Sequence, residues 1–235
     1  MSKIILFKNN KGGVGKSWIT LQIAHALQIK TGKEILILTT DSQNNILHYA
    51  GKENVEFNGG LEDWIKGKEG EMICIREKLH FIPLMADYIK PTSRNNLVSF
   101  IQSLRERFEY ILIDSTPTLS LDKDFLELAD EIIIPTFLDS VTTTSIVNLI
   151  KQVDKLKVKA IIPNRYTRTA KENQYYSSLV EVLDQTGIML TIPISQSGEI
   201  GKLIDKGKTI WESNSSKTEH IRDIFVNIVE VICNE

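Results

Sequence analysis

Short apolar runs rich in Ile, Leu and Val recur along this chain of 235 residues and limit the folds that it can adopt. The runs cover 4–7, 35–38, 80–84, 110–113, 132–134, 158–162 and 189–192. Several are apolar at successive positions, which is typical of strands buried on both faces in a parallel sheet. Segments with helical spacing lie between them, as in right-handed crossovers. The pattern predicts an α/β fold with a doubly wound, mostly parallel sheet and helices on both faces.

Apolar side chains at helical spacing predict where the helices lie. They are expected over 17–30, around 98–104, around 141–150 and, as a closing helix, over 217–233. The stretch 51–70 is interpreted as a polar surface excursion with a short helix. No internal repeat or Pro/Ser-rich linker interrupts this order, so residues 1–235 are predicted to form a single domain.

Composition narrows the functional classes. The chain has 28 Lys and Arg against 30 Asp and Glu, a net charge of −2, which excludes a polybasic protein but not a local basic face. No apolar run approaches the roughly 18 residues that span a bilayer, and the first residues lack a signal peptide's apolar region. The 2 cysteines and 4 scattered histidines match no disulfide framework or metal motif. A cytoplasmic protein without a stable membrane anchor is expected.

The strongest functional signal is the segment 9–17, Asn-Asn-Lys-Gly-Gly-Val-Gly-Lys-Ser, between the first apolar run and the first predicted helix. Glycines let backbone N–H groups turn inward around an anion, and a helix N-terminus adds further N–H groups and its positive dipole end. Lys16 is placed to reach the β- and γ-phosphates of a nucleotide, and the Ser17 hydroxyl to bind Mg²⁺. The predicted phosphate cradle also includes Gly12, Gly13, Val14 and Gly15.

Two carboxylates follow apolar runs and are expected at the edge of the sheet where nucleotides bind. Asp114 ends the buried run 110–113, which is the Walker B arrangement, and is predicted to hold Mg²⁺ through a water molecule. Asp41 follows the run 35–38 closely.

The loop departs from the common GxxxxGK[ST] pattern, because Asn10 replaces the first glycine and Lys11 supplies a second lysine. In this form it resembles the deviant Walker A loop, KGGxGK[ST], of the ParA/MinD group of ATPases. The resemblance runs from about residue 3 to 212 and is greatest to small, Soj-like partition ATPases without an N-terminal helix-turn-helix domain. It implies the P-loop NTPase fold, ATP and Mg²⁺ as ligands, and an ATP-bound homodimer in which Lys11 reaches the partner's phosphates.

Further stretches extend the resemblance and assign roles. Thr39-Thr-Asp41-Ser-Gln-Asn-Asn resembles the first switch, DxDPQGN, and implies that Asp41 orients or deprotonates the attacking water. Thr39 replaces the switch's first aspartate, which bears on the hydrolysis rate more than on nucleotide binding.

The resemblance also assigns further residues to the nucleotide. Asn164 matches an asparagine that contacts adenine, and Pro193, in a segment that resembles the family's closing Ile-Pro region, is expected to bind the nucleotide as well. Trp18 replaces a threonine that is available to the α-phosphate, so nucleotide affinity or helix packing is expected to differ there.

ParA-type ATPases bind DNA without sequence preference as ATP-bound dimers, and they act with a ParB-like centromere-binding protein. The resemblance therefore implies plasmid or chromosome partition and association with the nucleoid. Basic residues that could form a DNA-binding face are Lys151, Lys155, Lys157, Lys159, Arg165, Arg168, Lys171, Lys202, Lys206 and Lys208. An ordinary solvated lysine face is the competing interpretation.

Two alternatives remain open from the sequence. A MinD-like positioning ATPase needs a basic amphipathic C-terminal helix, but Glu219, Asp223 and Glu230 offset Arg222 in this segment. A nucleotide-gated protein scaffold that scarcely hydrolyses ATP is consistent with Thr39.

Overall fold

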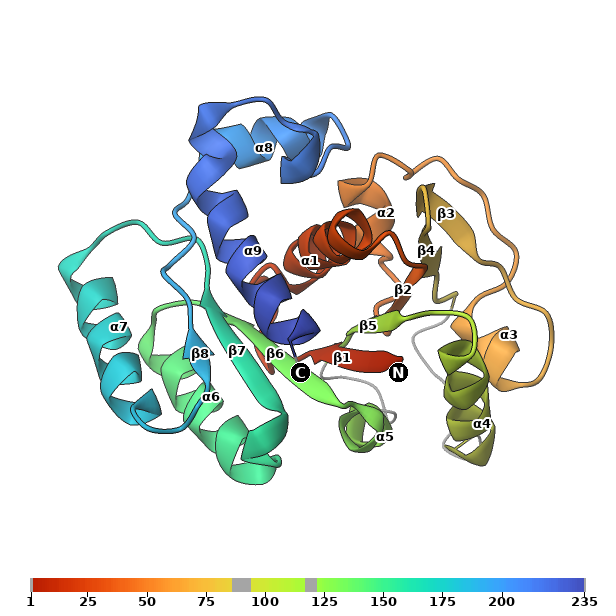
Figure 1. Cartoon of the computed structure of the whole chain (residues 1–235), viewed down its shortest axis with the longest axis horizontal. Helices are drawn as coiled ribbons and strands as arrows, with labels where there is room; N and C mark the ends of the chain where they lie inside the picture. Colours follow the sequence, from red (N-terminus) through yellow and green to blue (C-terminus); the bar gives the residue numbers. More distant parts are fainter. Residues whose placement is uncertain (1, 86–93, 117–121, 235) are drawn as a thin grey trace.

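The computed structural model describes residues 2–85, 94–116 and 122–234, which form a central sheet between two helical layers. The eight-stranded sheet has the order β3-β4-β2-β5-β1-β6-β7-β8 (Figure 1). All neighbouring strands are parallel except β3 and β4, which are antiparallel. The strands are β1 (Lys3–Phe7), β2 (Ile35–Thr39), β3 (Ile73–Arg76), β4 (Leu79–Ile82), β5 (Tyr110–Asp114), β6 (Glu131–Thr136), β7 (Val158–Pro163) and β8 (Met189–Leu190).

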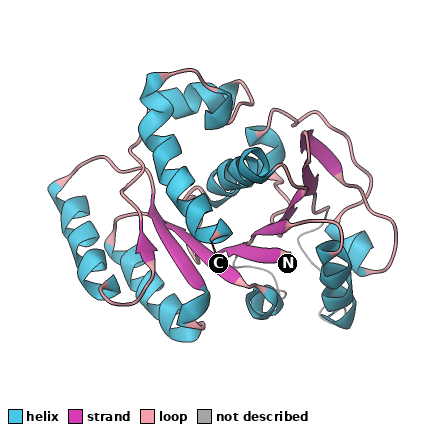
Figure 2. Ribbon diagram, viewed as in Figure 1, coloured by secondary structure: helices cyan, strands magenta, loops and turns pink. Residues whose placement is uncertain are grey.

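The helices divide between the two faces of the sheet (Figure 2). One face is covered by α1 (Lys16–Thr31), α2 (Asn45–Tyr49), α8 (Gly198–Asp205) and α9 (Glu219–Cys233). The other is covered by α3 (Leu61–Ile65), α4 (Arg94–Arg105), α5 (Asp122–Leu128), α6 (Ser140–Gln152) and α7 (Ala170–Leu183). Short 3₁₀ turns occupy η2 (Lys155–Lys157), η3 (Ile210–Glu212) and η4 (Ser216–Thr218).

The central strand β1 shows why its sequence is apolar at successive positions. Ile4 and Leu6 pack into the core beneath α4, α5 and α6, whereas Ile5 and Phe7 pack into the core beneath α1 and α9. All four side chains are fully buried. The strand therefore has no face in contact with water, as expected for a doubly wound sheet.

The predicted α/β fold is confirmed, and so are strands at each of the predicted runs. The structure differs from the prediction at two places. The antiparallel edge strand β3 was not predicted, because Ile73-Cys-Ile-Arg76 is short and exposes alternate side chains. Val141, the second residue of α6, has 66% of its surface exposed, so it does not share the buried stripe of Ile146 and Ile150. Within the described residues, no helix is long and apolar enough to cross a membrane.

Candidate nucleotide-binding site

The loop between β1 and α1 is held in shape by asparagines. The Asn9 side chain donates to the carbonyl of Pro135 at 2.7 Å and accepts from the N–H of Lys11 at 2.8 Å. Gly15 caps α1 with a φ of 89°, and a Cβ atom there would lie 2.3 Å from Nδ2 of Asn164. Only glycine fits this left-handed and crowded position. The loop therefore approaches β7 through its backbone, which keeps N–H groups available to an anion.

A cavity of about 400 Å³ lies over the carboxyl ends of β1, β2 and β5. It gathers most of the predicted phosphate and metal site. Its lining comprises Gly12, Gly13, Gly15, Lys16, Ser17, Asp41, Asn45, Tyr49, Asp114, Thr116 and Arg165. Parallel strands end at one edge of a sheet, so residues far apart in sequence meet here. The cavity combines a cationic loop with two carboxylates.

Asp114 is the most buried acid in this cavity, with 2% of its surface exposed. Burial raises its pKa to about 6, and the Asp41 carboxylate adds to this effect. A hydrogen bond from the Ser17 hydroxyl and the charge of Lys16 act in the opposite direction. The Ser17 hydroxyl and the Asp114 carboxylate thus lie together as an oxygen pair, the ligand type that Mg²⁺ prefers.

The segment after β2 orients Asp41. The buried Thr39 hydroxyl accepts a hydrogen bond from the Asp41 N–H at 3.1 Å, and the Asp41 carboxylate accepts from the N–H of Gln43 at 3.0 Å. These two local turns hold the carboxylate at the strand end. Thr39 therefore supplies a structural hydrogen bond where the related switch carries an aspartate.

A second cavity of about 320 Å³ adjoins the first, and Gly15, Tyr49 and Arg165 line both. The remaining lining residues are Trp18, Asn164, Ser195, Gln196, Ser197, Ile200, Gly201 and Ile204. Its mixture of aromatic, aliphatic and amide groups is typical of a site for a flat heterocycle.

Three further residues predicted to bind the nucleotide lie differently with respect to this second cavity. Asn164 lines it, while its side chain donates to the Val14 carbonyl at 3.0 Å and accepts from the N–H of Arg165 at 2.9 Å. Trp18 also lines it and packs edge-on against Phe225, with ring centroids 5.8 Å apart. Pro193 lines neither cavity; Ser195, Gln196 and Ser197 lie there instead.

Lys11 points away from the phosphate cavity. Its Nζ lies 2.7 Å from Oδ2 of Asp139 and 5.5 Å from the centre of the Phe137 ring. Burial raises the pKa of Asp139, but hydrogen bonds from Lys11 and Thr142 outweigh burial and lower this pKa to about 2. Asp139 also caps α6 through the N–H of Thr142 at 2.8 Å. In this structure, Lys11 is therefore paired within its own chain.

The basic residues proposed for DNA do not form one group along the sheet. Three of them precede β7 at its amino end (Lys151, Lys155 and Lys157), and Lys159 lies within that strand. Three follow β7 at its carboxyl end (Arg165, Arg168 and Lys171), and three lie in or after α8 (Lys202, Lys206 and Lys208). Arg165 lines both cavities, so the second set lies on the nucleotide side, whereas the first lies at the opposite end of β7. The third set belongs to the region of α8, whose Ile200, Gly201 and Ile204 line the second cavity.

Tyr49 and Asp139 are among the residues of this region that sequence reasoning missed. Tyr49 lines both cavities, and burial raises the pKa of its phenol. Asp139 pairs with Lys11 and follows β6 at the same carboxyl edge. The position of Asp139 shortly after the apolar run 132–134 is a usable signal, because Asp41 and Asp114 also follow apolar runs. No sequence signal marks Tyr49.

A parallel sheet with a glycine loop, a lysine and two carboxylates on one cavity defines a P-loop nucleotide-binding protein. The AAA_31 family model, described as an AAA domain, matches residues 2–164. This chain belongs to the ParA/MinD-type P-loop ATPases.

Individual relatives agree with this placement. The chain is 28% identical over 225 residues to a putative septum site-determining protein MinD of Emiliania huxleyi, covering 89% of this chain and 80% of the relative. It superposes on apo McdA of Cyanothece with a TM-score of 0.79 at 17% identity, covering 99% and 100% of the two chains. A putative plasmid partition protein of Borrelia burgdorferi bound to AMPPNP gives a TM-score of 0.77 at 21% identity, covering 100% and 99%.

Proposed function

We propose that this protein is a ParA-type ATPase that binds ATP and Mg²⁺, dimerises, and then binds DNA without sequence preference in plasmid or chromosome partition. The observation that carries the proposal is the phosphate cavity, where Lys16, Ser17, Asp41 and Asp114 meet around the glycine loop. The whole chain would act as one domain.

In the proposed reaction, the residues of the loop bind the triphosphate and one carboxylate orients water. Backbone N–H groups of Gly12 to Gly15 hold the phosphates, and Lys16 neutralises charge that develops at the bridge between the β- and γ-phosphates. Asp41, held by its two local turns, accepts a hydrogen bond from the attacking water and directs it in line.

The donor set fits a magnesium ion. The Ser17 hydroxyl and the Asp114 carboxylate already lie within hydrogen-bonding distance of each other at the phosphate cavity. Ser17 would bind the ion directly and Asp114 would bind it through water. When bound, Mg²⁺ supplies positive charge to the β- and γ-phosphates.

Dimerisation is proposed to depend on Lys11. Its ammonium must leave Asp139 before it can reach the phosphates of a second subunit. The ion pair is more than one third exposed on both sides, so its loss costs little in water, and a triphosphate is a stronger partner. The ATP-bound dimer is then the state that acts on DNA, and a ParB-like protein would stimulate hydrolysis.

Two observations support the DNA-directed role. The basic groups that follow β7 lie at its carboxyl end, the nucleotide side, so a dimer would place two sets of cations near one interface. A partition protein of Borrelia burgdorferi shares the fold. Nucleoid association would follow from DNA binding.

The test is binding to a random-sequence DNA duplex at about 0.1 M salt with ATP, with ADP and without nucleotide. Tight, salt-sensitive binding with ATP alone is expected. The partition role would be contradicted by ATP-dependent dimers that bind no DNA in any state. That outcome would favour a protein-directed or MinD-like, membrane-directed switch.

A second candidate is a nucleotide-gated scaffold with very slow hydrolysis, which Thr39 favours because no second carboxylate stands at that position. The two candidate functions differ in the rate of ATP hydrolysis that accompanies a given affinity for ATP. A scaffold would bind ATP and dimerise, yet release no measurable phosphate over many lifetimes of the dimer.

A further inference from the structure

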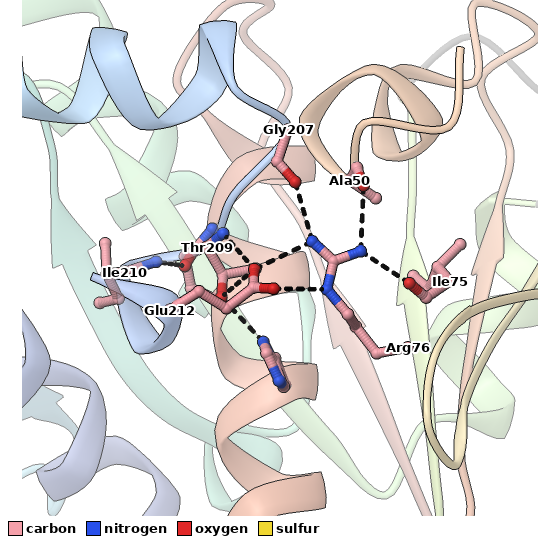
Figure 3. A network of polar contacts seen from close by, with 9 residues as sticks. Ala50, Ile75, Arg76, Gly207, Thr209, Ile210 and Glu212 are labelled. Atoms are coloured by element: carbon pink, nitrogen blue, oxygen red, sulfur yellow. Dashed lines mark hydrogen bonds and ion pairs between the residues drawn. The ribbon is translucent and has the colours of Figure 1, made fainter. Parts of the chain in front are cut away.

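The guanidinium of Arg76, at the end of edge strand β3, joins segments that are far apart in the sequence (Figure 3). Its Nε and Nη2 donate to the two carboxylate oxygens of Glu212 at 3.1 and 2.9 Å. Nη2 also donates to the carbonyl of Gly207 at 2.8 Å. Nη1 donates to the carbonyls of Ala50 at 3.0 Å and Ile75 at 2.6 Å. All five N–H groups of the guanidinium are therefore engaged.

Glu212, the partner of Arg76, is itself fixed to the core. Its carboxylate accepts from the N–H and the hydroxyl of Thr209 at 2.8 and 3.2 Å. The Thr209 hydroxyl also lies 2.8 Å from Nδ1 of His25, a buried residue of α1. The Arg76–Glu212 pair thus links the edge of the sheet to the helix that begins at the phosphate loop.

Two of the three backbone carbonyls held by Arg76, those of Ala50 and Gly207, belong to the ends of two helices in contact. Ala50 caps α2, and Gly207 follows the end of α8. A Cβ atom on Gly207 would lie 2.2 Å from the Cα of Gly51, and both glycines have positive φ angles of 60° and 68°. The helix ends therefore meet backbone to backbone, and Arg76 bridges the contact.

Both helices form walls of the second cavity. Tyr49 of α2 lies next to Ala50, the residue whose carbonyl Arg76 holds. Ile200 and Ile204 of α8 also line this cavity. Arg76 lines neither cavity, so any effect on a ligand must pass through these helices.

We propose that Arg76, paired with Glu212, is a positioning residue that fixes α2 against α8 and so sets the fit of the second cavity to a nucleotide base. This inference rests on the proposed function, because it takes that cavity as the base site. Lysine cannot replace Arg76, since one ammonium cannot serve four acceptor groups in a planar, forked arrangement. The phosphate loop, by contrast, is held by the side chains of Asn9 and Asn164.

The experiment compares dissociation constants for ATP and for inorganic tripolyphosphate, both with Mg²⁺, by titration calorimetry. Tripolyphosphate probes the loop alone, whereas ATP also probes the base site. Arg76→Lys is expected to weaken ATP binding about tenfold and to leave tripolyphosphate binding unchanged. A general loss of stability would weaken the binding of both ligands alike. The ratio of the two dissociation constants therefore separates a positioning role from a merely structural one.

Two further variants complete the design. Arg105→Lys is the matched control, since Arg105 also joins separate segments by donating to Asp130 and to the Ser2 carbonyl, but lines neither cavity. It should leave the ratio unchanged. Glu212→Gln keeps the shape of the side chain and decides the question should Arg76→Lys fail to fold. It should weaken ATP binding alone.

The outcomes separate the role of Arg76 from nucleotide binding itself. Equal weakening of ATP and tripolyphosphate, or no weakening of either, overturns the role of Arg76 while leaving the nucleotide site intact. A wild-type protein that binds neither ligand overturns the proposed function, and the role of Arg76 with it.

Discussion

At the residue scale, the ion pair between Lys11 and Asp139 holds Lys11 away from the phosphate cavity. Lys11 and Asp139 follow two neighbouring strands, β1 and β6, and Nζ of Lys11 lies 2.7 Å from Oδ2 of Asp139. The lysine that marks the family's loop is thereby held within its own chain. The proposed dimerisation depends on Lys11 leaving the Asp139 carboxylate and binding the triphosphate of a second subunit.

This pairing predicts a pH dependence. The folded-state pKa of Asp139 is about 2, below the ordinary value of 3.8, so its charge stabilises the fold above about pH 4. That contribution is lost as the pH falls toward 2. Asp139→Asn keeps the helix cap but not the charge, so the variant should be less stable than wild type at pH 6. The difference in free energy of unfolding should narrow from pH 5 to pH 3, as measured by denaturant titration; a constant difference would contradict the assignment.

At the element scale, α9 supports the first turn of α1. Phe225 is fully buried and meets the Trp18 ring, which lines the second cavity. A bulky indole at this position is accommodated by packing between helices. Trp18, which stands where the family has a threonine, therefore packs against Phe225, a residue far away in the sequence.

Removing the Phe225 ring should lower the stability of the protein. Phe225→Ala is expected to destabilise the protein by about 3–5 kcal/mol, because it leaves a cavity under a large aromatic ring. Scanning calorimetry would measure the loss. Val226→Ala, on the same helix but 39% exposed, is the control and should change stability by less than about 0.5 kcal/mol. Similar losses in the two variants would argue against this packing.

The same scale shows what the sequence could predict. Strands such as β1 and β5 were predictable, because burial on both faces leaves an unbroken apolar run. Asp41 and Asp114 were placed on the nucleotide edge because they follow such runs. Strand β3 was not predictable, since an antiparallel edge strand needs no apolar run. Tyr49 and the contacts of Arg76 depend on how α2 meets α8, which local spacing does not encode.

At the scale of the whole molecule, one edge of the sheet concentrates the chemistry. The phosphate cavity, the second cavity and the Lys11 pair all lie at the carboxyl ends of parallel strands. The same edge carries the basic groups that follow β7, among them Arg165, which lines both cavities. A face-to-face dimer through this edge would bring nucleotide, Lys11 and cations of both subunits together.

The most direct measurement is the mass in solution, by sedimentation velocity, with a non-hydrolysable ATP analogue, with ADP and without nucleotide. The wild type should dimerise only with the ATP analogue. Lys16→Ala should bind no nucleotide and stay monomeric, whereas Lys11→Ala should bind nucleotide yet stay monomeric and lose turnover. A Lys11→Ala variant that dimerises and hydrolyses ATP like the wild type would contradict the account.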